Sequence, residues 1–234
     1  MFQKRSSILL LILLPLVVVH VSSSSAKAKE VEEHLNMGIK LLGAGQLAEA
    51  LNQFHAAIDL DATNYMSFYR RGTVLLAMGK FKQALADLSQ VVQLKPDFTS
   101  ARMQRANVLT KQGDFAAAIS DYEAILRGDQ SNAEAKTKLD KIFSMLNDLG
   151  VAKSHIAARN YVSAIELLTQ LLDTCPWSTE LHEFRSNCYL NLGELNKAIL
   201  DINALAKLIP DNTNAYYLLS ELHYKLGDAD LALK

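Results

Sequence analysis

The chain has 234 residues, half of them hydrophobic, and a formal net charge of −1 from 24 basic and 25 acidic side chains. This length and apolar content allow a substantial buried core and exclude a disordered chain. The 10 glycines and 4 prolines are too few for the turns of a β-rich fold, so we expect an all-α protein. The near-neutral charge offers no attraction for nucleic acid, and no such partner is expected.

The first 25 residues have the layout of a signal peptide. Lys4 and Arg5 precede an apolar run from Ile8 to Val19, and a serine-rich segment follows. A membrane anchor is the alternative, but this run is shorter than the roughly 20 residues that a spanning helix needs. We therefore expect cleavage near Ser23 to Ser25, entry into the secretory pathway, and no membrane span after cleavage.

A glycine followed by an alanine recurs along the chain. The pairs are Gly45 with Ala50, Gly79 with Ala84, Gly113 with Ala118, Gly193 with Ala198 and Gly227 with Ala232. The first three glycines are 34 residues apart, the period of the helix-turn-helix units of tetratricopeptide-repeat (TPR) proteins. Another unit fits between, with Arg159 in the glycine slot and Ala164 in the alanine slot, if residues 133–144 are an insertion.

The predicted units are therefore residues 31–64, 65–98, 99–132, 145–178, 179–212 and a truncated unit at 213–234. In each second helix, apolar residues at helical spacing predict one buried stripe, as in Leu47, Ala50, Leu51 and Phe54. The glycine ends each first helix in a left-handed conformation, and the alanine lets the two helices approach closely. Arg159 would be strained in that slot unless the turn differs.

The inserted segment, residues 133–144, contains no glycine or proline, and its apolar residues continue the helical spacing of the segment that follows. It is expected to lengthen a helix. The predicted fold is thus an all-α TPR solenoid, a right-handed superhelix with two subdomains, repeats one to three and repeats four onward, joined by one long helix.

Nothing in the sequence predicts catalysis. There is no metal-ligand spacing, no phosphate-binding loop and no nucleophile motif, so we expect no enzyme activity, no cofactor and no metal. Asp87, Asp121 and Asp201 share one slot of the second helices and are interpreted as a solvated, outward face. Cys175 and Cys188 are expected to lie too far apart for a disulfide and to stay unpaired.

A binding surface is predicted from the register of the repeat family, in which five positions of each first helix line a concave groove. In the first two units these positions are largely apolar, whereas in the fifth unit they are mostly polar. The candidate client-binding residues are Leu35, Ile39, Leu42, Met66, Tyr69, Leu76 and Met103, and the fifth unit has Glu180, Glu183, Asn187, Leu190 and Asn191. Exposed apolar patches commonly mark interaction sites.

The alternative is that these apolar side chains only pack on one another. Of these residues, Leu35, Ile39, Met66, Tyr69 and Leu76 are predicted to tolerate substitution by small polar residues without opening cavities in the core. Many TPR proteins grip the acidic tails of cytosolic chaperones with a clamp of Lys, Asn and Arg. The clamp positions here hold Leu35, Ile39, Arg70, Ser100 and Gln104, so that recognition is not expected.

Three segments, residues 41–65, 69–105 and 211–233, resemble the family of DnaJ homologue subfamily C member 3. This family consists of co-chaperones of the endoplasmic-reticulum (ER) lumen, also described as protein-kinase inhibitors. Its members are described as having nine TPR units, of which the first hold unfolded clients, and then a J domain that stimulates the chaperone BiP. The resemblance implies ER-luminal holding of unfolded or misfolded proteins, as part of the unfolded protein response.

The sequence has no His-Pro-Asp triplet, so a BiP-type partner is expected only through a J domain that is absent here. Because Lys234 falls within a helix of the sixth unit, a fragment or short isoform is expected, with Leu231 and Leu233 uncapped. A second hypothesis is a TPR adaptor for one folded partner, such as a protein kinase. A holdase should bind many denatured proteins, whereas an adaptor should ignore them.

Overall fold

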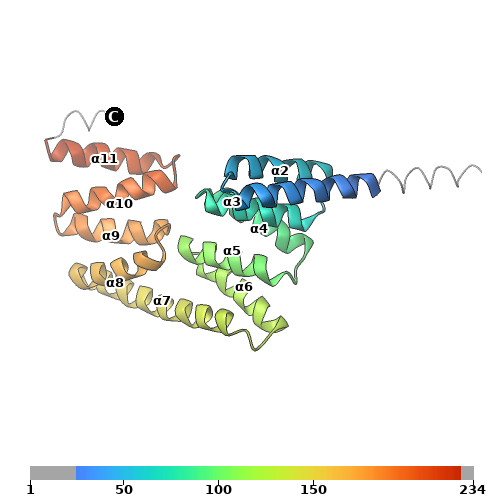
Figure 1. The fold of residues 1–234 in the computed structure, drawn as a ribbon. Coiled ribbons are helices and arrows are strands. Elements are labelled where there is room, and N and C mark those ends of the chain that lie inside the picture. Colours follow the sequence, from blue (N-terminus) through green and yellow to red (C-terminus); the bar gives the residue numbers. More distant parts are fainter. Residues whose placement is uncertain (1–24, 228–234) are drawn as a thin grey trace, which may run out of the picture. The chain divides into compact units, whose positions relative to one another are not determined.

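The computed structural model describes residues 25–227, and every regular element within that range is a helix (Figure 1). Residues 25–43 are helical, followed by α2 (Leu47–Leu60), α3 (Tyr65–Ala77), α4 (Phe81–Leu94), α5 (Thr99–Gln112), α6 (Phe115–Gly128), α7 (Ala133–Ala157), α8 (Tyr161–Thr174), α9 (Thr179–Asn191), α10 (Leu195–Leu208) and α11 (Thr213–Lys225). The all-α prediction is confirmed. Residues 1–24 of the predicted signal peptide, and also Leu231 and Leu233, lie outside the described residues.

The first helix of a pair commonly begins at a polar cap. The side chains of Asn64, Asn132, Ser178 and Asn212 each accept a hydrogen bond from a backbone N–H in the first turn of α3, α7, α9 and α11. Such a cap satisfies a donor that the helix itself leaves free. Asparagine or serine at these positions therefore fixes where these helices start.

The turn between the two helices of a pair requires a left-handed residue. Glycine occupies it at Gly79, where φ is +72°, and the N–H of Lys80 then donates to the carbonyl of Leu75 at 2.8 Å. Arg159 takes the same conformation, with φ +58°, and Asn160 donates to His155 at 2.9 Å. The turn is thus unchanged in the fourth unit, and the predicted backbone strain is present at Arg159.

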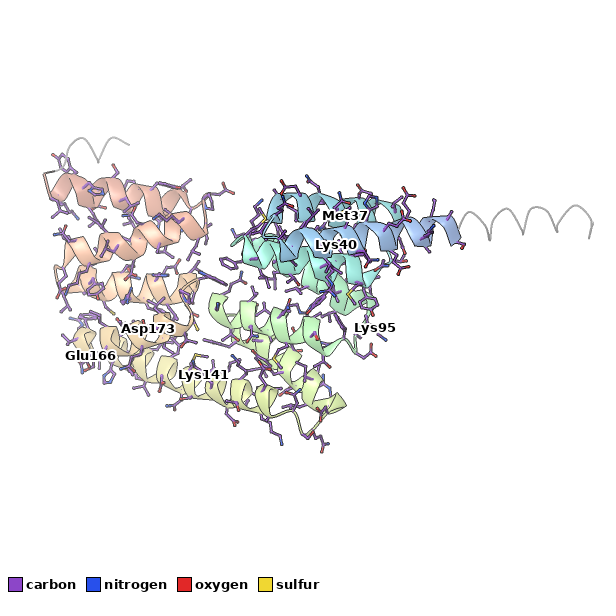
Figure 2. All side chains as sticks on the ribbon, in the orientation of Figure 1. Met37, Lys40, Lys95, Lys141, Glu166 and Asp173 are labelled. Carbon is purple, nitrogen blue, oxygen red and sulfur yellow. The ribbon has the colours of Figure 1, made fainter. Side chains whose placement is uncertain are left out.

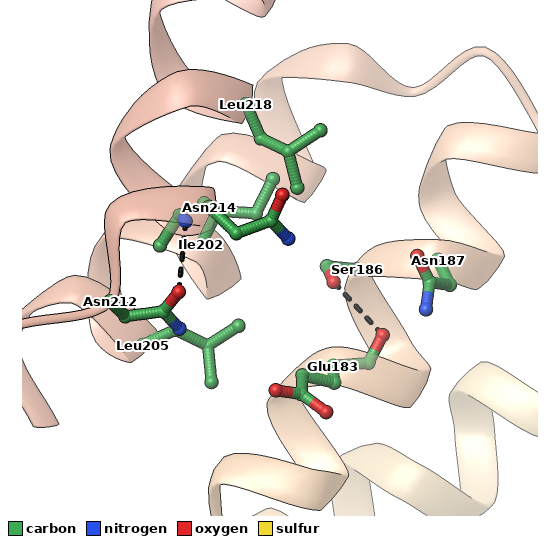
Figure 3. A pocket seen from close by; sticks show the side chains of 9 residues that line it. Glu183, Ser186, Asn187, Ile202, Leu205, Asn212, Asn214 and Leu218 are labelled. Carbon is green, nitrogen blue, oxygen red and sulfur yellow. Dashed lines mark hydrogen bonds between the residues drawn. The ribbon is translucent and has the colours of Figure 1, made fainter. Parts of the chain in front are cut away.

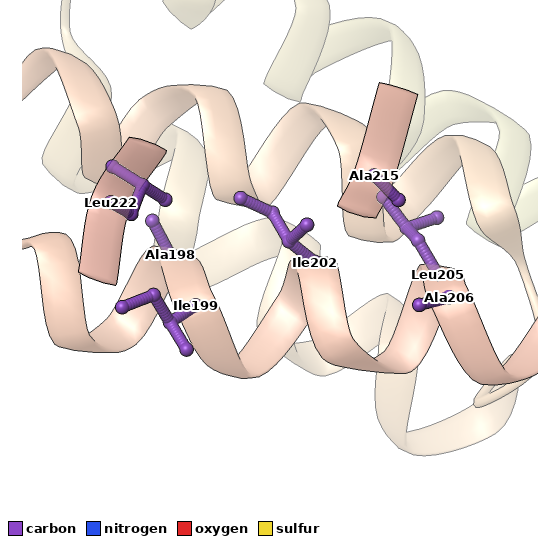
Figure 4. Close-up of a cluster of buried hydrophobic side chains, with 7 residues drawn as sticks. All are labelled: Ala198, Ile199, Ile202, Leu205, Ala206, Ala215 and Leu222. Carbon is purple, nitrogen blue, oxygen red and sulfur yellow. The ribbon is translucent and has the colours of Figure 1, made fainter. Parts of the chain in front are cut away.

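The core lies between helices, along the apolar stripes. Ala50, Ala84, Ala118, Ala164 and Ala198, one in each second helix, are completely buried. Figure 4 shows one such cluster, in which Ile202 and Leu205 of α10 pack with Ala215 and Leu222 of α11. The small alanines let the helix backbones approach, and the larger side chains fill the space beside them.

The segment 133–144 lies within the single helix α7, which continues without a break to Ala157. Ile142, Met145 and Leu149 form part of its buried face. The chain divides into two compact units, up to Ala101 and from Arg102 onward. The boundary therefore falls inside α5, not at α7, where the sequence had suggested a junction between subdomains.

Contacts far apart in the sequence explain why the third repeat belongs to the second unit. The N–H of Trp177, in the loop between α8 and α9, donates to the carbonyl of Lys111 at 3.0 Å, and the Lys111 ammonium lies 5.0 Å from the centre of the indole ring. A Cβ at Gly113 would come within 2.5 Å of the Ser178 hydroxyl. The end of α5 is therefore closely packed against this loop.

The interpretation of Asp87, Asp121 and Asp201 as a solvated face is wrong. All three are buried, with at most 5% of the residue exposed. Asp87 accepts two hydrogen bonds from the Arg71 guanidinium, at 2.7 and 2.8 Å. Because a buried carboxylate needs compensating donors, this slot faces the first helix of its own unit and not the solvent.

The two other carboxylates have more donors still. Asp121 accepts from Arg105 and from Arg102 at 2.7 to 2.8 Å. Asp201 accepts from Arg185 at 2.7 and 2.9 Å and lies 2.7 Å from His182 Nδ1. Arginine and aspartate, 16 residues apart on the paired helices, thus form one recurring buried ion pair in the second, third and fifth units.

Cys175 and Cys188 are buried free thiols. Cys175 directly follows α8, and Cys188 lies in α9. Burial raises the pKa of the Cys175 thiol to about 11. This thiol therefore stays protonated near neutral pH, as expected of a side chain that packs and does not react.

Candidate client-binding groove

The candidate residues of the first compact unit come from two first helices, residues 25–43 and α3. Leu35 and Leu42 are half-buried and pack against the cluster of Ala50, Phe54 and Val74. Ile39, between them in sequence, is 40% exposed. Only Ile39 of these three presents a large part of its side chain to solvent.

The position of this first helix is set by a glycine. A Cβ at Gly38 would lie 2.5 Å from the Phe54 ring of α2, so only glycine allows the approach that is seen. The close contact buries Phe54 completely. Ile39, next to Gly38 in the chain, is therefore carried by a helix that is held firmly against α2.

In α3, the candidate residues are Met66, Tyr69 and Leu76. The Asn64 cap, which accepts from the N–H of Met66 at 3.0 Å, fixes Met66 in the first turn. Tyr69 and Leu76 are half-buried and pack against a cluster built on Leu88, with the Tyr69 ring 4.9 Å from the Phe98 ring in an edge-on arrangement. Met66 is also half-buried but is not among the residues packed against that cluster.

The apolar residues predicted to line the groove therefore have two roles. Leu35, Leu42, Tyr69 and Leu76 contribute to the interhelical core, so the prediction that Leu35, Tyr69 and Leu76 tolerate substitution without opening cavities is wrong. A half-buried leucine on a first helix can touch the second helix with one side and the solvent with the other. Ile39 and Met66 are the better probes of binding.

Met103, the seventh candidate, lies on the part of α5 that belongs to the second unit and is half-buried. The structure places the other six in the first unit, on adjacent helix pairs. The side chains of both units are drawn in Figure 2, where Met37, 49% exposed, marks the helix that also carries Ile39.

The fifth unit is polar where the sequence predicted it. Glu183 and Asn187 of α9 line a cleft of about 260 Å³ together with Asn212 and Asn214, at the start of α11 (Figure 3). Glu180, which precedes them, accepts a hydrogen bond from Lys153 of α7 at 2.9 Å. This cleft offers amide and carboxylate groups beside the apolar side chains of Ile202, Leu205 and Leu218.

Within the described residues, no group of three or more His, Cys, Asp or Glu side chains could hold a metal ion. In the same part of the chain, none of the helices has the length and apolar character needed to span a bilayer.

Helix pairs that repeat every 34 residues, each closed by a left-handed turn, define the chain as a tetratricopeptide-repeat protein. Residues 69–133 match the family model described as tetratricopeptide repeat. The sequence is 45% identical over 207 residues to DnaJ homolog subfamily C member 3 of Mus musculus and 46% identical to that of Homo sapiens, covering 87% of this chain.

A solved structure described as the P58(IPK) TPR domain is 47% identical, with a TM-score of 0.81 over 87% of this chain and 57% of that one. The resemblance stated from the sequence is confirmed. The chain spans 41% of the length of the curated relatives that it matches.

Proposed function

We propose that this chain is the client-holding TPR part of a co-chaperone, and that its N-terminal groove binds exposed apolar segments of unfolded or misfolded proteins. The observation that carries this proposal is the partly exposed apolar surface of the first unit, where Ile39 and Met66 lie on neighbouring first helices. Aliphatic side chains and methionine suit a surface that accepts varied partners, because they adapt to many shapes.

The similarity to DnaJ homolog subfamily C member 3 supports the co-chaperone assignment. We further propose that the chain acts in the ER lumen, in protein folding and the unfolded protein response, as the resemblance of its sequence to this family implies. The signal-peptide pattern of residues 1–25 supports the same compartment. Sequencing the N-terminus of protein recovered from the secretory pathway tests the location, and a cytosolic protein that still begins at Met1 would contradict it.

Binding selectivity tests the holding function. The full chain is immobilised and exposed to several unrelated proteins, each presented both folded and as a reduced, denatured chain. A holdase captures the denatured form of every protein and none of the folded forms, because only unfolding exposes their apolar segments. Capture of a single folded protein, for example a kinase domain, with no binding of denatured chains would instead support the adaptor hypothesis.

A further inference from the structure

A second candidate binding site lies in the other compact unit, where α5, α6, α7 and the end of α8 meet. It is a cleft of about 320 Å³, whose lining includes Lys111 of α5 and both Lys138 and Lys141 of α7. No carboxylate lines it. Figure 2 labels Lys141 on α7.

The three lysines form no salt bridge with any carboxylate of the described residues, although Glu134 and Asp121 act electrostatically on Tyr122 of the same cleft. Among the described residues, no aspartate or glutamate lies within ion-pair distance of Lys111, Lys138 or Lys141. Lys153, elsewhere on α7, shows the contrast, because its ammonium pairs with Glu180 at 2.9 Å. Three like charges around one concavity raise the local concentration of an anionic ligand.

Tertiary contacts fix the position of Lys111 at the edge of this cleft. The backbone hydrogen bond from Trp177 to Lys111, and the stacking of the Lys111 ammonium on the indole ring, attach the end of α5 to the loop after α8. Because Lys111 is held in this way, its charge has a defined position. The ring contact leaves the ammonium hydrogens that point away from the indole free to donate.

An amide side chain also lines the cleft. The Tyr122 hydroxyl donates to Asn107 Oδ1 at 2.9 Å, which fixes the orientation of the Asn107 amide. Burial raises the pKa of Tyr122 to about 12, so that this hydroxyl stays protonated and keeps donating. Lysine ammoniums and an amide N–H₂ are the groups that bind carboxylate oxygens.

We infer that this cleft binds an acidic segment of a polypeptide, with glutamate or aspartate carboxylates between Lys111, Lys138 and Lys141. The Met145 side chain adds an apolar wall for the aliphatic stem of such a residue. The volume suits one or two side chains, and the net charge of −1 for the whole chain does not favour an extended polyanion such as nucleic acid. The site differs from the clamp positions of the first three repeats and does not depend on the apolar groove.

The test uses the full chain and a labelled ten-residue peptide of alternating glutamate and serine, with a glutamine-for-glutamate peptide as its neutral counterpart. Lys138→Gln with Lys141→Gln removes two charges but keeps most of each aliphatic stem. Lys136→Gln with Lys207→Gln removes the same charge from two exposed lysines outside the cleft. Fluorescence anisotropy gives each dissociation constant, and circular dichroism verifies the fold.

We expect Lys138→Gln with Lys141→Gln to weaken binding of the acidic peptide about tenfold. The control variant should bind the acidic peptide as tightly as the wild type does. The neutral peptide should bind to neither variant. Added salt should weaken binding by the wild type. Equal binding by the two variants would overturn the inference. Displacement of the peptide by inorganic phosphate, or tighter binding of an oligonucleotide of equal charge, would assign the cleft to a different anion. The groove variant Ile39→Ser with Met66→Ser should keep peptide binding, which separates this site from the proposed function.

Discussion

At the residue scale, the buried arginine–aspartate pair is the feature that periodicity alone did not predict. Helical spacing correctly placed the three aspartates in one slot, but it does not show which charged slot faces another helix. A signal was present in the sequence: the pairs Arg71 with Asp87, Arg105 with Asp121 and Arg185 with Asp201 all have the same separation. In the fourth unit both slots are apolar, with Val151 and Leu167, so the two positions change together.

This joint change predicts a stability cycle in the second unit. Asp87→Leu alone should lower the free energy of unfolding by about 3 kcal/mol, because it leaves the half-buried Arg71 without its carboxylate. Arg71→Val with Asp87→Leu copies the fourth unit and should recover most of that loss. Urea unfolding of the wild type and of both variants measures these free energies. A double variant no more stable than Asp87→Leu would show that the two slots are not coupled.

Asp201 makes stability depend on pH. Burial alone would raise its pKa, but the hydrogen bonds and charges of Arg185 and His182 outweigh this and hold the pKa below the ordinary 3.8. The ionised form is therefore favoured by folding, and its contribution, fully present above the unfolded-state pKa, is lost as the pH falls through the lower folded-state value. The free energy of unfolding of the wild type should fall steeply below about pH 4.

Asp201→Asn removes this titration, so its free energy of unfolding should be lower than that of the wild type at pH 6 and should change less between pH 5 and pH 3. Urea unfolding over that range measures both slopes. Asp129→Asn is the control, because this carboxylate is exposed and its lowered pKa comes from hydrogen bonds with Ser131. Equal slopes for the wild type and Asp201→Asn would contradict the account.

At the scale of single elements, the helices follow from local signals, whereas the division into units does not. The recurring glycines predicted the positions of the turns within the helix pairs. The absence of glycine and proline in residues 133–144 predicted that this segment is helical, and it lies within α7. The boundary inside α5 depends on contacts between Trp177 and Lys111, which are 66 residues apart in sequence. A contact between residues so far apart cannot be predicted from the local sequence around either one.

The turn at Arg159 offers a test of backbone strain. Arg159→Gly should raise the free energy of unfolding by about 1 kcal/mol, because a left-handed conformation is unfavourable for a residue with a Cβ. Gly193→Ala is the matched reverse change: its φ is +75° and an added Cβ would meet no atom within 4 Å, so it should lose a similar amount through the backbone alone. Thermal and urea unfolding measure both. If Arg159→Gly destabilises the chain, the arginine makes a compensating contact that outweighs the strain.

At the scale of the whole molecule, the two compact units offer different chemistry. The first offers partly exposed apolar side chains on neighbouring helices, and the second offers a lysine-lined cleft and an amide-lined cleft. The sequence located the apolar candidates through the repeat register. It did not separate Ile39 and Met66 from the four that also support the core, because half-burial depends on how closely each helix pair packs.

The most direct test of the central claim is the affinity of the chain for a reduced, denatured protein after Ile39→Ser with Met66→Ser. Losing two apolar anchors of this size should remove about 2 kcal/mol of binding free energy, and so weaken capture by more than tenfold. Val162→Ser with Leu200→Ser is the control, because these residues are 58% and 71% exposed and lie in the second unit. If the groove variant keeps its melting curve and captures the denatured protein as well as the wild type and the control do, the N-terminal groove is not the client site.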